Sequence, residues 1–374
     1  MPNYLFSAAL AAAILLSQSA RSAERERVIE TQSGPIAVET IASGLDDPWS
    51  LAFLPDGRFL ITQRSGRIRF VTRQGNISAP LAGVPEVYSS GQGGLLDVAL
   101  APDFATSRLI YFTFGEPGEG GASTAVARAR LTDDRLQDTT VIFRSVPKTG
   151  GGAHFGSRLA FARDGTLFVT TGERFQFEVA QDLSHHMGKV VRINPDGSVP
   201  SDNPFVGRAN VRPEIWSYGH RNVEGAAIHP QTGRLWTHEM GPAGGDELNI
   251  TEAGRNFGWP VVSWGRHYDG RVIPAPTTRP DLAAPIRYWN PVIAPSGMAF
   301  YTGDAIPAWK GNLLIGGMVA RAIVRLTLNG EQVTGEERVS MGGRIRDVRQ
   351  GPDGAVYALD ESNGTLLRLT AARR

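Results

Sequence analysis

Short runs in which apolar and polar residues alternate recur along this 374-residue chain, and pairs of runs are joined by turns rich in Pro, Asp and Gly. Alternation with a period of two predicts half-buried β-strands, and an Asp-Gly type of turn between two runs predicts a hairpin. No long stretch has the helical period. The repeated unit appears six times, as LAFLPDGRFLIT (51–62), DVALAPDFATSRLIYFTF (97–114), RLAFARDGTLFVTTG (158–172), AAIHPQTGRLWTHE (226–239), SGMAFYTGDAIPAWKGNLLIGG (296–317) and DVRQGPDGAVYALD (347–360).

The spacing of these hairpins predicts the fold. Successive turns lie 47 to 73 residues apart, which suits four-stranded antiparallel blades joined by loops of varied length. Six units predict an all-β protein, a six-bladed β-propeller. We expect the strand-like segment 38–43 to pair with the last blade and close the ring, which removes free sheet edges. The longest loops fall between about 145 and 290, where function is expected to concentrate.

The N-terminal residues predict export. Residues 4–16 form an apolar run of signal-peptide length, followed by small residues and then by the charged stretch ERERVIE. We interpret residues 1–23 as a cleaved signal peptide and residues 24–374 as a single propeller domain in the periplasm. No basic side chain precedes the apolar run, so an uncleaved membrane anchor is the alternative. No later segment has the length of a transmembrane span.

The charge balance limits the partners to expect. Lys and Arg number 38 against 37 Asp and Glu, so no basic field predicts binding to nucleic acid or anionic lipid. A small, nearly neutral ligand is a better match. The chain has no cysteine and therefore no disulfide, although an oxidising compartment would permit one. The oligomeric state is not predicted.

Polar side chains stand just before the first strand of several repeats. Equivalent positions in successive blades lie on one face around the propeller axis, so repetition predicts that these side chains converge. Taken singly, each has a simpler interpretation as a loop histidine, an arginine bonded to loop carbonyls or a solvated arginine pair. The residues are Gln92 before the second unit, His154 before the third, Arg221 and Asn222 before the fourth, and Arg344 and Arg346 before the sixth.

The residue types suggest proton transfer and the binding of an anionic ligand. His154 is the side chain best suited to take a proton at neutral pH. Arg221 and Asn222 suit an oxyanion that develops in a closed site. Arg344 and Arg346 lie two residues apart, so they share one side of an extended strand and would suit a ligand with several carboxylates.

Oxygen donors are concentrated in the segment HEMGPAGGDELNITEAGRNFGWP (238–260). Gly241 and Pro242 offer carbonyls in a tight turn, and Asp246 and Glu247 offer carboxylates. Hard oxygen ligands without a His or Cys cluster favour Ca²⁺ over Zn²⁺. An acidic hairpin turn without a metal is an equally good interpretation of these residues alone.

At these positions the chain resembles the soluble PQQ-dependent aldose sugar dehydrogenases, relatives of soluble glucose dehydrogenase. The resemblance covers about residues 38–370. Together its motifs are specific, whereas a PDG turn alone would mean little. The motifs are GQGGLLDVALAPDF, MGKVVRINPDGSVPSDNPF, YGHRNVEG, GPAGGDELN, NFGWP, APSG and RIRDV.

The resemblance implies a role for each candidate. His154 corresponds to the general base that takes the proton of the anomeric hydroxyl, and Arg221 with Asn222 to the groups beside the C5 oxygen of pyrroloquinoline quinone (PQQ). Arg344 and Arg346, with Arg321 as a further candidate, would bind the PQQ carboxylates. We expect Gln92 and Trp289 to contact the sugar. The carbonyls of Gly241 and Pro242 correspond to a Ca²⁺ site at the quinone, and Glu247 with the Phe257 carbonyl to a second, structural Ca²⁺ site.

Three departures from the family pattern bear on affinity and selectivity. Ala320 stands where a lysine is expected to bind a PQQ carboxylate, and Arg321 follows it. Ala153 replaces an Asp before the catalytic histidine of the glucose-specific members, and Met240 replaces a Gln. These last two changes favour a broader range of aldoses. Loop residues 173–186, with Glu173, Arg174, His185 and His186, are weaker candidates for sugar contact.

The resemblance therefore implies a periplasmic dehydrogenase that uses PQQ and Ca²⁺ to oxidise the C1 hydroxyl of aldoses to lactones and passes electrons to a separate acceptor. Two alternatives stay open. A non-catalytic propeller could use the same face to bind carbohydrate or protein, which the change at Ala320 favours. A Ca²⁺-dependent lactonase would need carboxylates at the axis, where the starts of the repeats supply His, Arg and Gln instead.

Overall fold

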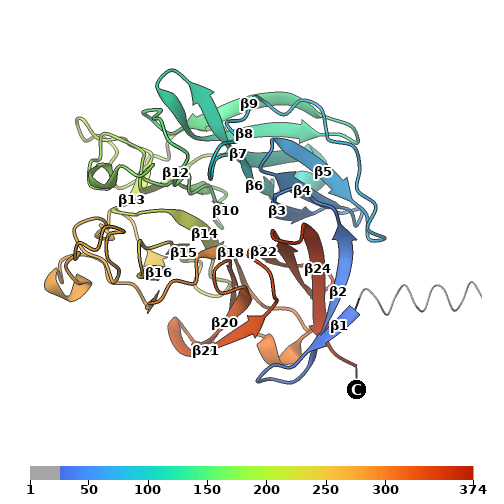
Figure 1. Ribbon diagram of the computed structural model, residues 1–374. Helices are drawn as coiled ribbons and strands as arrows, with labels where there is room; N and C mark the ends of the chain where they lie inside the picture. Colours follow the sequence, from blue (N-terminus) through green and yellow to red (C-terminus); the bar gives the residue numbers. More distant parts are fainter. Residues whose placement is uncertain (1–25, 374) are drawn as a thin grey trace, which may run out of the picture.

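Six antiparallel sheets form a ring around a central axis (Figure 1). The computed structural model describes residues 26–373, so the predicted signal peptide lies outside the described residues. The prediction of a six-bladed β-propeller is confirmed, and each hairpin repeat forms the two innermost strands of one blade. Within the described part, four sheets have the predicted four strands, one has three and one has five.

The blades follow one another along the chain. The strands of the first three blades, from the axis outward, are β3 (Pro48–Phe53), β4 (Phe59–Gln63) and β5 (Arg67–Val71); β6 (Leu95–Leu100), β7 (Leu109–Gly118), β8 (Gly121–Leu131) and β9 (Leu136–Arg144); and β10 (Leu159–Phe161), β11 (Leu167–Thr170), β12 (Lys189–Ile193) and β13 (Ile215–Tyr218).

The last three blades have the same order from axis to rim, and the sixth also contains the N-terminal strands. They are β14 (Val223–Ile228), β15 (Leu235–Glu239), β16 (Asp246–Thr251) and β17 (Arg287–Trp289); β18 (Pro295–Phe300), β19 (Leu313–Gly317), β20 (Ala322–Asn329) and β21 (Gln332–Ser340); and β22 (Ile345–Gln350), β23 (Val356–Asp360), β24 (Thr365–Ala371), β2 (Ile36–Ser43) and β1 (Glu26–Ile29).

Within residues 26–373, helical structure is confined to single turns in the loops. These are the α-helix α2 (Phe104–Ser107) and the 3₁₀ turns η1 (Phe177–Ala180), η2 (Pro276–Thr278) and η3 (Pro307–Trp309). In the stretch from residue 26 to 373, no helix is both long and apolar enough to cross a bilayer.

The ring is closed as expected, by pairing of the N-terminal strand β2 with the C-terminal strand β24. The first blade departs from the prediction because residues 77–82 run beside β5 without forming a regular strand. Ser78 and Leu81 donate backbone hydrogen bonds to this edge, while Pro80 between them has no N–H to donate.

Burial along each strand reflects its distance from the axis. The second strands of the blades are buried on both faces, as in β4 and β23, whereas the outer strand β21 alternates between buried and exposed residues. The larger apolar clusters each fill the space between two adjacent blades, and the ring has one for every pair of neighbours. Packing between sheets therefore holds the ring together.

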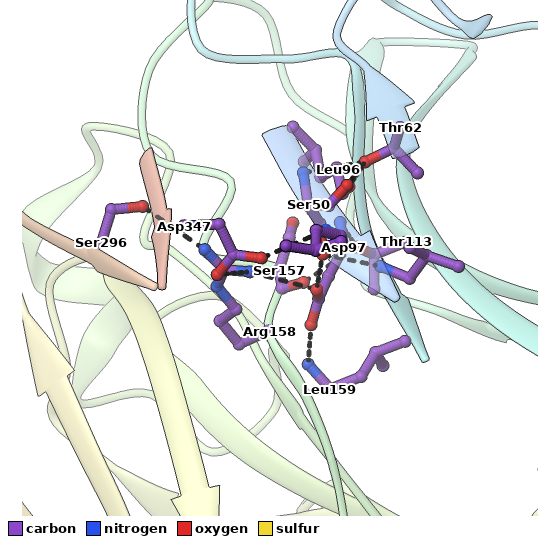
Figure 2. Close-up of polar contacts among 12 residues, drawn as sticks. Ser50, Thr62, Leu96, Asp97, Thr113, Ser157, Arg158, Leu159, Ser296 and Asp347 are labelled. Atoms are coloured by element: carbon purple, nitrogen blue, oxygen red, sulfur yellow. Dashed lines mark hydrogen bonds and ion pairs between the residues drawn. The ribbon is translucent and has the colours of Figure 1, made fainter. Parts of the chain in front are cut away.

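The axis itself is polar. Asp97 accepts hydrogen bonds from Ser50 Oγ (2.6 Å) and from the backbone N–H of Leu159 (2.8 Å), and it pairs with Arg158 Nη1 at 3.1 Å (Figure 2). Arg158 also pairs with Asp347 at 3.2 Å. These side chains come from blades 1, 2, 3 and 6, so ion pairs cross the axis where apolar packing cannot reach.

Register shifts direct side chains toward this axis. In five blades the innermost pair of strands has an irregularity near the start of its first strand. The skipped positions include Trp49, Glu224 and Arg346. A bulge turns its extra residue away from the regular alternation, and bulges of this kind often adjust side chains beside functional sites.

Candidate active site

The predicted residues meet at the end of the propeller where the innermost strands begin, which we call the top face. A continuous chain of contacts joins blades 2, 3, 4 and 6 there. Gln92 Oε1 accepts the backbone N–H of His154 (2.6 Å), Asn222 Oδ1 accepts the backbone N–H of Gly156 (3.0 Å), Asn222 Nδ2 donates to Glu224 Oε1 (3.1 Å), and Arg346 Nη1 donates to Glu224 Oε2 (2.7 Å).

His154 is nearly buried, and its ring is held by a carboxylate that sequence reasoning ranked low. Its Nδ1 lies 2.5 Å from Oε2 of Glu173, a side chain with no exposed surface. With the carboxylate as acceptor, Nδ1 carries the proton and Nε2 keeps its lone pair. Burial lowers the pKa of His154 below its ordinary value, and Glu173 only partly offsets this shift. A neutral imidazole with an available Nε2 can accept a proton.

Gly172 lies so close to the backbone of His154 that a larger residue would not fit in its place. A Cβ on Gly172 would lie 2.3 Å from the carbonyl oxygen of His154 and 2.8 Å from Asn222 Oδ1. Only glycine therefore allows the loop that carries His154 to approach the start of β14 this closely.

Arg221 lies beside this base and is also buried. Its backbone N–H donates to Glu239 Oε2 (2.6 Å), and its Nη1 donates to the carbonyls of Met240 (3.0 Å) and Gly241 (2.7 Å). Its Nε is buried without a hydrogen-bond partner among the described residues. The guanidinium therefore retains an unused donor in a low-dielectric position.

Arg344 and Arg346 both pair with one anion, and this anion belongs to the protein. One carboxylate bridges the pair, with Glu361 Oε2 3.2 Å from Arg344 Nε and Oε1 3.0 Å from Arg346 Nη2. Arg346 is buried and also pairs with Glu224, whereas Arg344 is partly exposed. Burial opposes ionisation of Glu361, but Arg346 and Arg344 lower its pKa below the ordinary value.

Arg321 and Trp289 were also predicted to bind ligand, and the first is exposed whereas the second is buried. Arg321 is exposed on the turn that follows Met318, and Met318 Sδ contacts Arg344 Nη2 at 3.4 Å. Within residues 26–373 the Arg321 guanidinium forms no ion pair. Trp289 lies on the outermost strand of blade 4, buried between blades 4 and 5, and its Nε1 donates to Glu336 (3.0 Å). The expectation that Trp289 contacts sugar is therefore wrong, because its ring is used in packing.

Two further histidines, His220 and His186, are held by hydrogen bonds away from His154. His220 is fully buried between Ser217 Oγ and Glu239 Oε1, both 2.8 Å away. His186 Nδ1 accepts the backbone N–H of Val146 (3.2 Å) and its Nε2 lies 3.2 Å from Glu214. Neither belongs to the chain of contacts that joins the blades at the top face.

The oxygen-rich segment forms a small cavity next to Arg221. Glu239 and Glu247 are paired residues on β15 and β16, and both line this cavity together with Gly241 and Phe257. Burial, and then repulsion by Glu239, raise the pKa of Glu247 well above its ordinary value. Asn249 Nδ2 lies between the two carboxylates, 3.3 Å from Glu239 and 3.5 Å from Glu247. Glu239 also accepts hydrogen bonds from His220 and Arg221, whereas Glu247 has Asn249 alone, so Glu247 is the carboxylate most in need of a cation.

Arg221 and Asp246 hold the turn before β16 in place. The carbonyl of Gly241 accepts a hydrogen bond from Arg221, and its N–H donates to Asp246 Oδ1 (2.9 Å). Asp246 Oδ2 accepts the N–H groups of Ile293 (2.7 Å) and Ala294 (2.8 Å). Asp246 thus fixes the turn. No group of three or more His, Cys, Asp or Glu side chains suited to one metal occurs in the described part.

Aromatic side chains that the sequence analysis did not single out lie over Arg221. Tyr268 Oη accepts from Arg221 Nη2 (3.3 Å), and the guanidinium lies 5.3 Å from the ring of Trp259. Phe175 stacks parallel to Tyr268 with centroids 6.3 Å apart, and its ring also lies 5.2 Å from the ring of His154. Tyr268 and Phe175 are about two-thirds and one-half exposed. An exposed aromatic pair beside a base can contact the apolar face of a sugar ring.

The fold and this site define a propeller whose top face presents a carboxylate-bound histidine beside buried arginines. The profile of the Glucose / Sorbosone dehydrogenase family matches residues 45–368, and the chain belongs to this family.

Two curated relatives have informative names. The aldose sugar dehydrogenase YliI of Escherichia coli is 46% identical over 346 residues, which cover 90% of this chain and 93% of the relative. Quinoprotein glucose dehydrogenase B of Acinetobacter calcoaceticus is 28% identical, with 88% of this chain and 86% of the relative covered.

Solved structures show the same relationship. The apo-form of the E. coli aldose sugar dehydrogenase superposes with a TM-score of 0.87 at 46% identity, covering 90% of this chain and all of that one. The PQQ-bound aldose sugar dehydrogenase of Streptomyces coelicolor gives a TM-score of 0.74 at 29% identity, covering 90% of this chain and 98% of that one.

Proposed function

We propose that this protein oxidises the C1 hydroxyl of aldose sugars to the lactone, with PQQ as the hydride acceptor and Ca²⁺ as a second cofactor, and passes the electrons to a separate acceptor. We further propose that it does so in the periplasm, after removal of residues 1–23. The observation that carries the proposal is His154, whose Nδ1 is fixed by Glu173 and whose ring lies near the arginine-rich centre of the top face. The named relatives support the same assignment.

The donors on the top face fit a ligand with several carboxylates. Arg344 and Arg321 are accessible cations on adjacent blades, and the unpartnered Nε of Arg221 is a donor in need of an acceptor. We expect Arg344, Arg321 and Arg346 to face the carboxylates, and Arg221 with Asn222 to face the quinone oxygen. Ala320 leaves one cation fewer than the family pattern. We expect Arg321 to supply part of that charge from the same turn.

The buried carboxylates at the start of β16 fit a cation. Glu247 and Glu239 lie beside the Phe257 segment, and a Ca²⁺ there would remove their mutual repulsion. The carbonyls of Gly241 and Pro242 are the proposed ligands of the Ca²⁺ at the quinone. The Gly241 carbonyl already accepts a hydrogen bond from Arg221 Nη1, so its second lone pair is the one proposed for the metal.

The reaction divides the two hydrogens of the alcohol between cofactor and protein. PQQ, when bound, supplies the acceptor for the hydride of C1 and hence for two electrons. His154 Nε2 accepts the hydroxyl proton, and Glu173 stabilises the imidazolium that results. Arg221 would stabilise the negative charge that develops on the acceptor. Tyr268 and Phe175 orient the sugar ring against His154. We infer from Ala153 and Met240 that the pocket accepts a broad range of aldoses.

The carboxylates on the top face support a lactonase less well than they support a dehydrogenase. Glu224 and Glu361 do bring carboxylates to the top face, which the sequence analysis did not foresee. Both are paired with Arg346 at 2.7 and 3.0 Å. Carboxylates neutralised in this way are poor ligands for a central Ca²⁺.

The deciding experiment is a titration of purified apo-protein with PQQ, with and without Ca²⁺, followed by dye reduction with a panel of aldoses. We expect saturable quinone binding, seen by its absorbance, and Ca²⁺-dependent activity. The variant His154→Ala should retain quinone binding and lose activity. No saturable binding at micromolar PQQ would overturn the proposal and favour the non-catalytic propeller.

A further inference from the structure

Arg174 connects the loop of Glu173 to the loop that precedes His154. Its Nη2 donates to the carbonyl of Gly151 (2.6 Å) and more weakly to that of Thr149 (3.5 Å), and its Nη1 donates to the carbonyl of Ala153. Its Cζ lies 3.6 Å from the centroid of the Phe155 ring. The guanidinium therefore contacts residues on both sides of His154.

The surroundings of Arg174 are unusual for a buried cation. The side chain is almost fully buried, no carboxylate within the described residues pairs with it, and its Nε has no hydrogen-bond partner. Burial lowers its pKa to about 10. Burying an unpaired cation costs free energy, so its contacts with carbonyls and with the Phe155 ring must offset that cost. An apolar side chain would fill the space at lower cost if packing were the only requirement.

Side-chain packing does not confine the first two glycines of the contacted loop. Residues 150–152 are three consecutive glycines, and a Cβ on Gly150 or Gly151 would meet nothing within 4 Å, so neighbouring side chains do not confine them. Glycine has the largest conformational freedom in the unfolded chain. His154 itself has φ 53°, in the left-handed region that non-glycine residues avoid. Hydrogen bonds from outside the segment keep it in one conformation: Gln92 holds Gly152 and His154, and Arg174 holds Thr149, Gly151 and Ala153.

The loop that carries Arg174 is constrained in the same way. Arg174 and Phe175 have φ values of 59° and 61°, so two successive non-glycine residues are left-handed. This conformation lets Glu173 Oε2 bond both His154 Nδ1 and the backbone N–H of Phe175 (2.8 Å), while Arg174 turns toward the glycines. Glu173 thus holds the imidazole ring, and its neighbour holds the backbone that carries the ring.

We propose that Arg174 is a positioning residue that fixes the glycine-rich loop and so places His154 Nε2 for proton transfer. This inference rests on the proposed function for its kinetic consequence, but the placement of the ring can be tested without activity. Arg174 does not touch the reacting atoms. Its effect should therefore appear in the turnover number and in the state of His154, and not in quinone affinity.

The kinetic test compares Arg174→Met and Arg174→Lys with the wild type in the PQQ- and Ca²⁺-loaded protein. We expect kcat to fall about 100-fold in Arg174→Met, as for other losses of alignment, with the KM for sugar and the Kd for PQQ nearly unchanged. Arg174→Lys retains a cation that can reach some of the carbonyls, so it should recover part of the loss. The matched control is Arg163→Met, because Arg163 Nη2 donates to the Pro230 and Gln231 carbonyls in a loop between other strands. It should keep wild-type kcat.

The second test reads His154 directly in the apo-protein. Histidine ¹⁵N NMR, with the signal assigned by comparison with His154→Asn, should show one tautomer protonated at Nδ1 in the wild type and in Arg163→Met. In Arg174→Met we expect exchange between tautomers. If Arg174→Met fails to fold, Arg174→Lys decides both tests. Wild-type kcat together with an unchanged His154 signal in a folded Arg174 variant would overturn the inference. A wild type without quinone activity would instead overturn the proposed function and leave the NMR test standing.

Discussion

Glu173 is the residue on which the chemistry of His154 depends most directly. Burial lowers the pKa of His154, so the imidazole stays neutral until the pH falls through a value below its ordinary 6.5. A base must be neutral to act, so wild-type activity should persist below pH 6.5 and fall only as the pH drops through that lower value. Glu173→Gln removes the carboxylate that partly raises the pKa. We therefore expect the acid limb of kcat/KM to move to lower pH, while kcat falls about 100-fold because the imidazolium loses its partner.

The measurement for this prediction is a pH–rate profile from pH 4.5 to 8 for the wild type and for Glu173→Gln. Glu178→Gln is a matched control, since Glu178 is an exposed glutamate in the same loop. An acid limb that moves upward in Glu173→Gln would contradict this assignment of the dyad.

Glu361 presents a second prediction at the level of one residue. Its carboxylate bridges Arg344 and Arg346 in the place proposed for the cofactor carboxylates, so it neutralises cations that the ligand needs. Glu361→Gln should bind PQQ about three- to tenfold more tightly, a modest gain because Arg344 is partly exposed and solvent screens its charge. Titration of apo-protein by absorbance measures this. Glu331→Gln, whose carboxylate pairs with Arg234 on another loop, should leave the Kd unchanged. Weaker binding by Glu361→Gln would mean that Glu361 organises the arginines and does not compete with the ligand.

At the scale of elements, sequence reasoning located the inner hairpins and the top-face residues because both repeat. Turns rich in Pro, Asp and Gly mark the inner hairpin in each unit, and the residues just before it fall on the same face. The partners of those residues could not be predicted. Glu361 follows β23, Glu224 lies at a bulge and Glu173 follows β11, and no local pattern links them to Arg346 or His154. Their pairing follows from the way adjacent blades are packed.

We predict that the hairpin of β15 and β16 binds Ca²⁺. The carboxylates of Glu239 and Glu247 repel each other in a buried position, and a bound Ca²⁺ would offset this repulsion. We expect saturating Ca²⁺ to stabilise the wild type by about 2.7 kcal/mol at one hundred times its Kd, by mass action. Glu247→Gln should lose most of this increment while being at least as stable as the wild type without metal, because the amide carries no charge.

Differential scanning calorimetry of EDTA-treated protein, with and without added Ca²⁺, measures the shift in Tm for the wild type and for Glu247→Gln. Glu252→Gln, at an exposed position beyond the end of β16, serves as the control and should keep the full Ca²⁺ shift. Equal shifts in Glu247→Gln and the wild type would place the metal elsewhere.

At the scale of the whole molecule, the number of blades could be predicted from the sequence, but the ion pairs at the axis could not. Apolar packing between neighbours follows from the alternating pattern of the strands. The axis instead depends on single polar residues at equivalent places in different blades, and their charges balance only in three dimensions. Asp97, Arg158 and Asp347 are an example, since each would be read from sequence as an isolated charge in a strand.

Arg158 is the residue through which all blades meet. From blade 3 its guanidinium lies 4.1 Å from the Trp49 ring of blade 1, pairs with Asp97 of blade 2, and donates to the Glu224 carbonyl of blade 4 (2.8 Å). It also reaches Ser296 Oγ of blade 5 (3.5 Å) and the Arg346 carbonyl of blade 6 (3.2 Å). Removing one member of a buried ion-pair network leaves the other charges uncompensated, so Arg158→Met should destabilise the protein by about 3–5 kcal/mol.

The strands that lose stability in Arg158→Met show whether Arg158 stabilises the whole ring or blade 3 alone. If Arg158 joins the blades, hydrogen exchange in Arg158→Met should accelerate in β6, β14 and β22 together, because each loses a contact at the axis. Arg279→Met, which breaks the exposed pair with Asp281, should change stability by less than about 1 kcal/mol and leave exchange unaltered. Faster exchange confined to β10–β13 would show that Arg158 stabilises blade 3 alone and that the ring is held by the clusters between blades.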